Sequence, residues 1–153
     1  MAVCVSFSFA QTKRNTVRRK TTVTKKRTPI KKMTNNPIKS AAQTTASGLT
    51  YIVTKHGEGA QIKAGDNVIV NYTGLLTNGQ KFDSSLDRGQ TFSFPVGAGK
   101  VIKGWDEGLQ KLRVGDHATL IIPPSIGYGA RGAGGVIPPD ATLIFIIEVV
   151  GVK

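Results

Sequence analysis

The side chains of this chain that could act on a ligand are aromatic rather than nucleophilic. The set that stands out is Tyr72, Phe82, Asp83, Phe92, Trp105, Tyr128 and Phe145. Aromatic rings offer broad apolar surfaces that hold other rings and apolar groups. No G-x-S-x-G turn, H-E-x-x-H pair, Walker loop or Cys-His pair accompanies them. The set predicts an apolar binding pocket, although each ring alone is more often core and Asp83 alone is more often a solvated turn residue.

Neither a soluble cofactor nor a metal is expected. Residues 127–132 match the dinucleotide pattern G-x-G-x-x-G, but that pattern needs a following helix to hold the pyrophosphate. Here the chain continues into further glycines and then prolines. Cys4 is the only cysteine, and His56 and His117 have no partner at metal-ligand spacing.

Most of the elements that must position these rings read as short strands. Apolar alternation and β-branched residues predict strands over residues 50–55, 67–73, 81–84, 91–94, 117–122 and 142–150. The last of these is apolar on both faces, which is typical of a central strand covered on both sides. A glycine- and proline-rich loop spans residues 125–141. We predict an α+β domain in which a twisted antiparallel sheet of about five strands wraps around one short helix.

That helix carries Trp105, the only tryptophan, and ends near Lys111. A helix this short is marginal in isolation, so packing against the sheet must hold it. The large ring of Trp105 is the side chain best able to provide that packing. It is therefore either the largest piece of the core or the wall of a pocket.

Charge divides the chain into two parts. Residues 1–47 hold 11 Lys and Arg and no acid, whereas residues 48–153 hold 10 Lys and Arg against 9 Asp and Glu. Residues 11–47 also have few apolar side chains, so we predict a disordered basic tail there and a folded domain over residues 48–153. The tail could bind an anionic surface or polymer, or it could be a solvated spacer. It has no aromatic residue between Thr12 and Thr50 with which to stack on bases.

Residues 1–10 form an uncharged apolar run that ends in small residues before Gln11. We interpret this run as the remnant of a signal peptide, which implies export to the periplasm or cell envelope. The alternative is a chance apolar N-terminus on a cytoplasmic protein. No run approaches the ~20 apolar residues that a membrane-spanning helix needs.

Five motifs occur in a fixed order along residues 48–153. They are Tyr72-Thr-Gly74, Gly79-x-x-Phe82-Asp83-Ser84, Val101-Ile102-x-Gly104-Trp105, Tyr128-Gly129 and Ile137-Pro138-Pro139-x-Ala141-Thr142-Leu143-x-Phe145. Together they closely resemble the FKBP-type peptidyl-prolyl cis-trans isomerases, as a single-domain, bacterial-like member with a basic N-terminal tail. The resemblance implies the same fold and a cavity between helix and sheet.

The resemblance also implies roles for individual residues. Catalysis would involve Asp83, as the one buried acid of the pocket, with Tyr128, Phe92 and Phe145. Substrate would contact Trp105 as the floor, the walls Tyr72 and Phe82, and the rims formed by Val101, Ile102 and Ile137. The main-chain N–H of Ile102 and the Tyr128 hydroxyl would hydrogen-bond a bound ligand.

The partners implied are proline-containing polypeptides and macrolides such as rapamycin, and a monomer is expected. A chain of this kind would accelerate X-Pro rotation without a covalent step. The alternatives are a non-catalytic interaction module on the same fold and a polyanion binder that acts through its tail. The chain differs from common family members at Lys100, Ile126, Ala133 and Gly134, and these positions bear on substrate preference and macrolide affinity.

Overall fold

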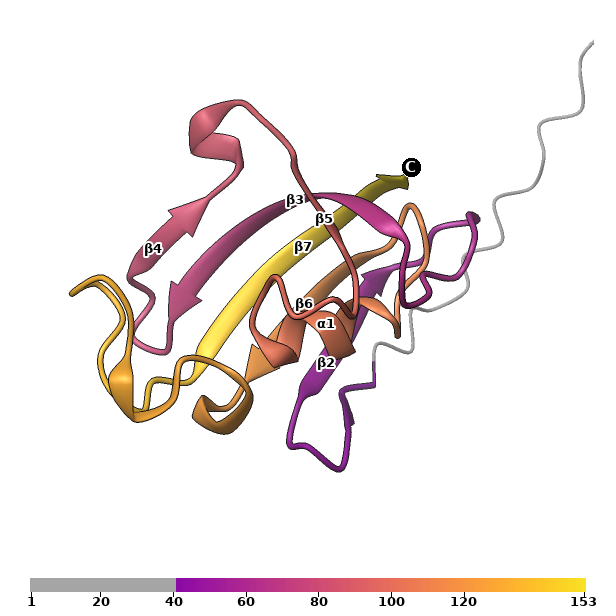
Figure 1. Cartoon of the computed structure of the whole chain (residues 1–153). Coiled ribbons are helices and arrows are strands. Elements are labelled where there is room, and N and C mark those ends of the chain that lie inside the picture. The colour runs from indigo at the N-terminus through magenta and orange to yellow at the C-terminus, as the bar shows by residue number, and fades with distance from the viewer. Residues whose placement is uncertain (1–40) are drawn as a thin grey trace, which may run out of the picture. The chain divides into compact units, whose positions relative to one another are not determined.

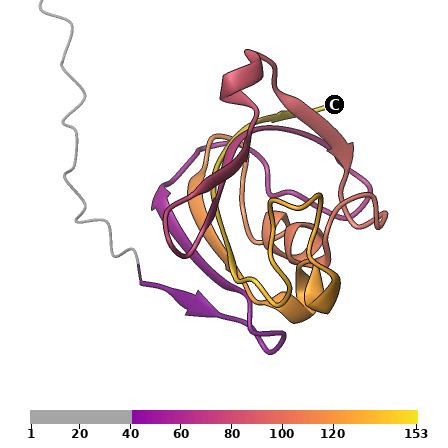
Figure 2. The ribbon, with the colours of Figure 1, turned by 90° about the vertical axis from the view of Figure 1, so that its left-hand side faces the viewer.

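Seven strands form one antiparallel sheet that curls around a short helix (Figures 1 and 2). The structure, a computed structural model, describes residues 41–153. Its strands are β1 (Gln43–Thr44), β2 (Thr50–Lys55), β3 (Asn67–Leu76), β4 (Lys81–Ser84), β5 (Phe92–Pro95), β6 (His117–Ile122) and β7 (Leu143–Val152), and its helix is α1 (Lys103–Leu109). Three 3-10 turns complete it: η1 (Leu86–Arg88), η2 (Pro124–Ile126) and η3 (Gly129–Arg131). The predicted α+β class is confirmed, with seven strands rather than about five.

The strand order is β1-β2-β6-β7-β3-β4, and β5 also pairs with β3. Strand β1 was not expected, since it falls within the range assigned to the disordered tail. Gln43 pairs with Tyr51 and Thr44 with Thr50, and the Tyr51 hydroxyl donates a hydrogen bond of 2.7 Å to the Gln43 side chain. Ordered structure therefore begins before residue 48, because this short segment completes the edge of β2. The predicted signal remnant and the tail up to residue 40 lie outside the described residues.

Strict alternation along β3 and β7 gives the sheet one buried face. In β3 every second residue from Val68 to Leu76 is buried, and in β7 the residues Leu143, Phe145, Ile147 and Val149 are buried. The expectation that the last strand is covered on both faces is wrong. Ile146 is 52% exposed and Val150 is 46% exposed, because α1 covers the inner face and no element of residues 41–153 covers the outer one.

Helix α1 approaches the sheet closely because two of its residues facing the sheet are glycines. A Cβ atom at Gly104 would lie 2.6 Å from Ile122 Cγ2, and one at Gly108 would lie 2.7 Å from Leu120 Cδ1. Both partners are fully buried on β6. Trp105 and Leu109 on the same helix are buried as well. Among residues 41–153 no helix is long and apolar enough to cross a membrane.

Replacement of Gly104 by alanine tests this close approach. We expect Gly104→Ala to lower the free energy of unfolding by about 1–2 kcal/mol. Overpacking costs about 1–3 kcal/mol, and the better helix propensity of alanine offsets at most about 1 kcal/mol of that. Urea unfolding of the full chain, followed by Trp105 fluorescence, measures the difference.

The matched control is Gly151→Ala, because a Cβ at Gly151 meets no atom within 4 Å. We expect its unfolding midpoint to stay near that of the parent chain. An unchanged midpoint in Gly104→Ala would show that β6 can retreat from α1 without loss.

Candidate active site

Trp105 lies at the centre of a cluster of aromatic side chains. Its side chain packs edge-on against Tyr72 and Phe145, with ring centroids 5.0 and 5.1 Å away. Phe92 and Phe94 lie 6.1 and 5.6 Å from it. Such pairs contribute about 0.5–1.5 kcal/mol each beyond their area burial. Trp105 is therefore held from several sides, and it is only 4% exposed.

A pocket opens over this cluster, on the side of the sheet that α1 covers. Its lining residues are Tyr72, Asp83, Phe92, Val101, Ile102, Trp105 and Phe145. Its empty volume is about 320 Å³, a figure that includes space open to solvent. All the lining side chains except Asp83 are apolar or aromatic, so the pocket suits a small apolar ring.

Two strands share one edge of β3, and the break between them shapes the acidic side of the pocket. Strand β4 pairs with the end of β3, where Asp83 lies opposite Gly74. Strand β5 pairs with its beginning, where Phe92 lies opposite Val70. The connecting residues 85–91 leave the sheet and contain η1, the loop at the top of Figure 1.

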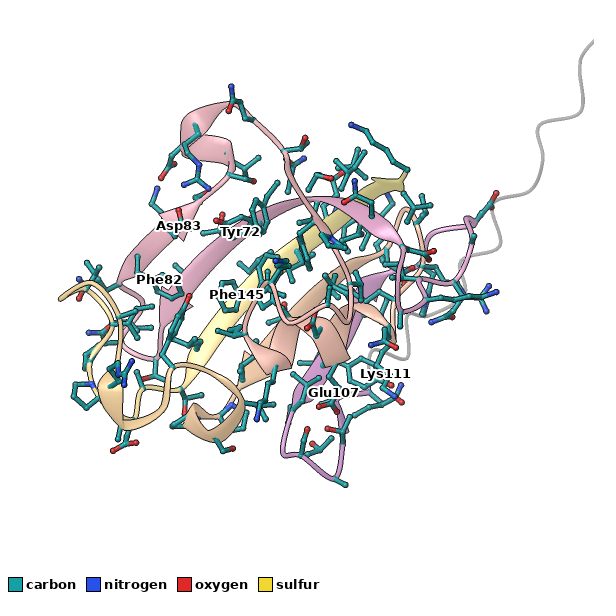
Figure 3. The ribbon with its side chains drawn as sticks, viewed as in Figure 1. Tyr72, Phe82, Asp83, Glu107, Lys111 and Phe145 are labelled. Carbon is teal, nitrogen blue, oxygen red and sulfur yellow. The ribbon has the colours of Figure 1, made fainter. Side chains whose placement is uncertain are left out.

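Gly74 allows the aromatic wall to form. A Cβ atom at this position would lie 2.6 Å from Phe82 Cζ and 3.0 Å from Phe145 Cε1. Without one, Phe82 of β4 and Phe145 of β7 meet edge-to-face across β3, at 5.5 Å between centroids. Figure 3 shows both rings on the same side of the sheet as Tyr72.

Asp83 is tied into a network with Tyr72 and Arg88 (Figure 3 labels the first two). The Tyr72 hydroxyl donates a short hydrogen bond to Asp83 Oδ2, and Arg88 Nη1 forms an ion pair with Asp83 Oδ1. Arg88 Nη2 also donates to the Tyr72 hydroxyl at 2.9 Å. The Asp83 side chain is 39% exposed. The expectation of a buried acid is therefore wrong, because the carboxylate sits at the mouth of the pocket, where η1 brings in its counter-ion.

This network sets the protonation states. Burial alone would raise the pKa of the Asp83 carboxyl, but the hydrogen bonds from Tyr72 and Arg88 outweigh burial and leave that pKa below its usual range. Burial, followed by the bond to Asp83, raises the pKa of Tyr72. Burial and the charge of Asp83 also raise the pKa of Tyr128. At neutral pH Asp83 is thus ionised, while the phenols of Tyr72 and Tyr128 are neutral.

Seven of the ten predicted site residues line the pocket together, namely Tyr72, Asp83, Phe92, Val101, Ile102, Trp105 and Phe145. Phe82 lies behind this lining, against Phe145. Tyr128 precedes η3 and is 39% exposed. Ile137, expected at a rim, is instead buried in the core at 6% exposure, where its main-chain bonds with Ala133 hold it.

Arg88 and Phe94 are residues of this cluster that no sequence pattern predicted as part of the site. Arg88 lies five residues after Asp83 in a polar stretch, and no pattern there signals an ion pair. Phe94 follows Phe92 with the period of a strand, so both rings were expected on one face. Indeed they stack at 5.2 Å, but only Phe94 is fully buried, at 4% exposure against 37% for Phe92.

A second hollow lies on the outer face of the sheet and has a different character. Asn71, Thr73, Leu86, His117, Ile146 and Glu148 contribute to it. The Glu148 carboxylate accepts a hydrogen bond of 3.1 Å from Asn71 and lies 3.6 Å from His117 Nε2. It has no wall of aromatic rings, so the inner pocket is the better candidate for a site that binds a ring.

A family profile and individual relatives in other organisms identify the same protein family. The sequence profile described as "FKBP-type peptidyl-prolyl cis-trans isomerase" matches residues 58–150. FK506-binding protein 1 of Dictyostelium discoideum is 55% identical over 106 residues, which are 69% of this chain and 99% of that protein. An FK506-binding protein of Neisseria meningitidis is 54% identical over 98 residues, which are 64% of this chain and 90% of that protein.

Solved structures agree with these sequence relatives. The crystal structure of AtFKBP13 matches with a TM-score of 0.71 and 38% identity, over 74% of this chain and 99% of that one. FkpA from Escherichia coli matches with a TM-score of 0.69 and 42% identity, over 73% of this chain and 51% of that one. On its fold, its sequence relatives and the profile that spans most of its domain, this chain belongs to the FKBP-type peptidyl-prolyl cis-trans isomerases.

Proposed function

We propose that the pocket over Trp105 is the active site at which this isomerase turns X-Pro bonds in polypeptides. One observation carries the proposal: the lining is apolar and aromatic apart from Asp83, and both oxygens of that carboxylate are already engaged. A proline ring is small and apolar enough for such a space. The group of lining residues offers no pair of nucleophile and base, and rotation about a C–N bond needs none.

The barrier to rotation is amide resonance, which places negative charge on the carbonyl oxygen and double-bond character on the C–N bond. Water stabilises that charge-separated planar form. The twisted transition state has lost the resonance and is less polar at oxygen. A pocket lined by Trp105, Tyr72 and Phe145 excludes water, so it favours the twisted state over the planar one.

Asp83 acts in this proposal mainly by positioning its neighbours. Its carboxylate fixes the Tyr72 hydroxyl, and the ring of Tyr72 forms a wall 5.0 Å from Trp105. Arg88 supports both groups and lies 5.8 Å from the centre of the Tyr72 ring. A direct interaction of Asp83 with the twisting amide is the alternative role.

Two donors at the rim are available to hold the peptide backbone. The main-chain N–H of Ile102 takes part in no backbone hydrogen bond within residues 41–153, and the Tyr128 hydroxyl lies near enough to Asp83 for that charge to raise its pKa, after the larger effect of burial. Phe92, at 37% exposure, offers an apolar surface at the entrance. We propose that these three groups, with Val101, orient the residues on either side of the proline.

Substitutions of Asp83 and Phe92 test the site. We expect Asp83→Ala and Phe92→Ala each to lower kcat/KM by about tenfold, since both remove contacts that shape the pocket rather than the core. A protease-free prolyl isomerase assay on the full chain measures the rate, and circular dichroism checks the fold.

Glu107→Gln is the matched control, because Glu107 lies on α1 at a distance from the labelled pocket residues (Figure 3). Its rate should equal that of the parent chain. Unchanged rates in both pocket variants would refute the assignment. A parent chain that does not isomerise any peptide would instead favour the non-catalytic interaction module.

The protonation states predict a flat pH profile. We expect kcat/KM to be constant between about pH 5 and pH 9, because the pKa of Asp83 is held low while those of Tyr72 and Tyr128 are raised. A carboxyl with a depressed folded-state pKa stabilises the fold above its unfolded pKa, and this contribution is lost as the pH falls through the folded pKa. Activity and stability should therefore decline together below about pH 4.

Arg88→Gln removes one of the groups that hold the pKa of Asp83 down. The loss of kcat/KM at acid pH should therefore begin at a higher pH in this variant. The assay is run across pH with a peptide that has no titrating side chain. An inflection near pH 6.5 in the parent chain would contradict this protonation scheme.

The sequence relatives are named for binding FK506, and we propose that macrolides of that class, rapamycin included, occupy this same pocket. An apolar ring of the macrolide would sit over Trp105 in place of proline. FK506 added to the isomerase assay should then act as a competitive inhibitor.

We also propose that the protein works as a monomer.

A second function is proposed for the basic tail. Eleven Lys and Arg with no acid over residues 1–47 give a salt-dependent attraction to polyanions. Deletion of residues 11–40, which keeps β1, should therefore weaken co-sedimentation with anionic vesicles at low salt. Equal binding by the full and shortened chains would leave the tail as a solvated spacer.

The proposed location rests on residues 1–10. We propose that they are the remnant of an export signal, which would place the protein in the periplasm or cell envelope, the alternative being the cytoplasm. Fractionation of cells that express the natural chain separates the two.

A further inference from the structure

Two lysines bracket the helix side of the pocket. Val101 and Ile102 line the pocket, and Lys100 and Lys103 are their immediate neighbours in the chain. Both lysines are exposed, whereas Val101 and Ile102 are partly buried. The rim is thus apolar at Val101 and Ile102, which line the pocket, and carries a positive charge on either side of them in the chain.

Neither lysine is neutralised by an ion pair within residues 41–153. The ion pairs there join Lys81 to Asp87, Arg88 to Asp83 and His117 to Glu148. The nearest acid along the chain is Asp106, and its two carboxylate oxygens accept hydrogen bonds from the main-chain N–H groups of Gly97 and Gly99, at 2.8 and 3.0 Å. Asp106 is therefore bound to the loop before α1, and no ion pair within residues 41–153 joins it to Lys103.

The opposite side of the mouth does not balance these charges. Its acid, Asp83, is matched by Arg88, so that pair adds no net charge. The acids on α1 are Asp106 and Glu107. Glu107 accepts a hydrogen bond of 2.6 Å from Ser47 and lies away from the labelled pocket residues (Figure 3). Against the charge of Asp106, the two lysines therefore leave the helix side of the mouth net positive. This holds although residues 48–153 as a whole carry only one positive charge in excess.

The pocket is small and partly open to solvent, so a proline ring that enters it leaves the side chains of the flanking residues at the rim. Carboxylates there would meet the two lysines in solvent of high dielectric, where each pair contributes modestly and the effect is screened by salt. We propose that Lys100 and Lys103 are specificity-determining residues that make this pocket prefer prolyl bonds flanked by acidic residues. This proposal rests on the proposed function and refines it by naming a substrate class.

The proposal is tested in the protease-free assay on the full chain with three peptides. They differ only in the residue before proline, which is Glu, Gln or Lys. At low ionic strength we expect kcat/KM for the Glu peptide to exceed that for the Gln peptide about fivefold, with the Lys peptide poorest. The difference should appear in KM rather than kcat, because the attraction acts equally on ground and transition states. It should shrink towards unity at about 0.5 M salt.

The variant K100Q/K103Q should bring the Glu-to-Gln ratio close to one, and K100E/K103E should invert the ranking of the Glu and Lys peptides. Lys111→Gln is the matched control: Lys111 is a lysine near the far end of α1, away from Tyr72 and Asp83 (Figure 3), and its ratio should stay at the parent value. A structural role for the lysines would change all three peptides alike and would not depend on salt.

The outcomes separate this inference from the function on which it rests. Equal kcat/KM for the Glu and Gln peptides in the parent chain at low salt would overturn the preference while leaving the isomerase site intact. A preference that survives in K100Q/K103Q would assign it to other groups. Failure to isomerise any of the three peptides would overturn both the proposed site and the preference.

Discussion

The packing of α1 against the inner face of the sheet is the constraint on which the rest of the structure depends. A helix of seven residues is not stable alone, and this one begins after Ile102 without a side-chain cap. Gly104 and Gly108 let its backbone reach β6, while Trp105 fills the space towards β3 and β7. The same ring that holds the helix in the sheet forms the floor of the pocket. Stability and binding therefore cannot be assigned to different residues here, and substitutions of Trp105 would affect both.

The charged side of the site has a different origin, in the way the chain leaves the sheet. Strands β4 and β5 both pair with the same edge of β3, and the loop that connects them contains η1. Without this loop Arg88 would not reach back to Asp83 and Tyr72. The loop also leaves the carboxylate at the mouth, where solvent and counter-ion keep it ionised, and leaves the apolar floor free of charge. The fold thus separates an apolar floor from a charged rim within one small pocket.

Sequence reasoning reached the fold class and most of the pocket, because alternation along strands is a local property. The alternation over residues 67–73 predicted a strand, and every second residue there, Val68, Val70 and Tyr72, is buried. The family resemblance supplied the pocket residues as a set. The features that the sequence did not predict depend on contacts that no periodic pattern of residues signals. The pairing of Gln43 with Tyr51, the reach of Arg88 and the burial of Ile137 are not visible in local patterns. The prediction that β7 is covered on both faces was wrong for a related reason. Apolar residues on a strand do not reveal whether another element covers them.

Among the described residues, Nε1 of Trp105 is the one buried side-chain nitrogen or oxygen without a hydrogen-bond partner. A buried donor left unpaired costs about 1–3 kcal/mol, and a carbonyl or hydroxyl at this position would remove that cost. Such an acceptor would also put a dipole beside the pocket floor. A polar floor would stabilise the planar, charge-separated amide as water does, and so would reduce the advantage of the twisted state. On the proposed mechanism, an acceptor at this position would therefore work against rotation, and the charged pair of the pocket, Asp83 and Arg88, lies at its rim.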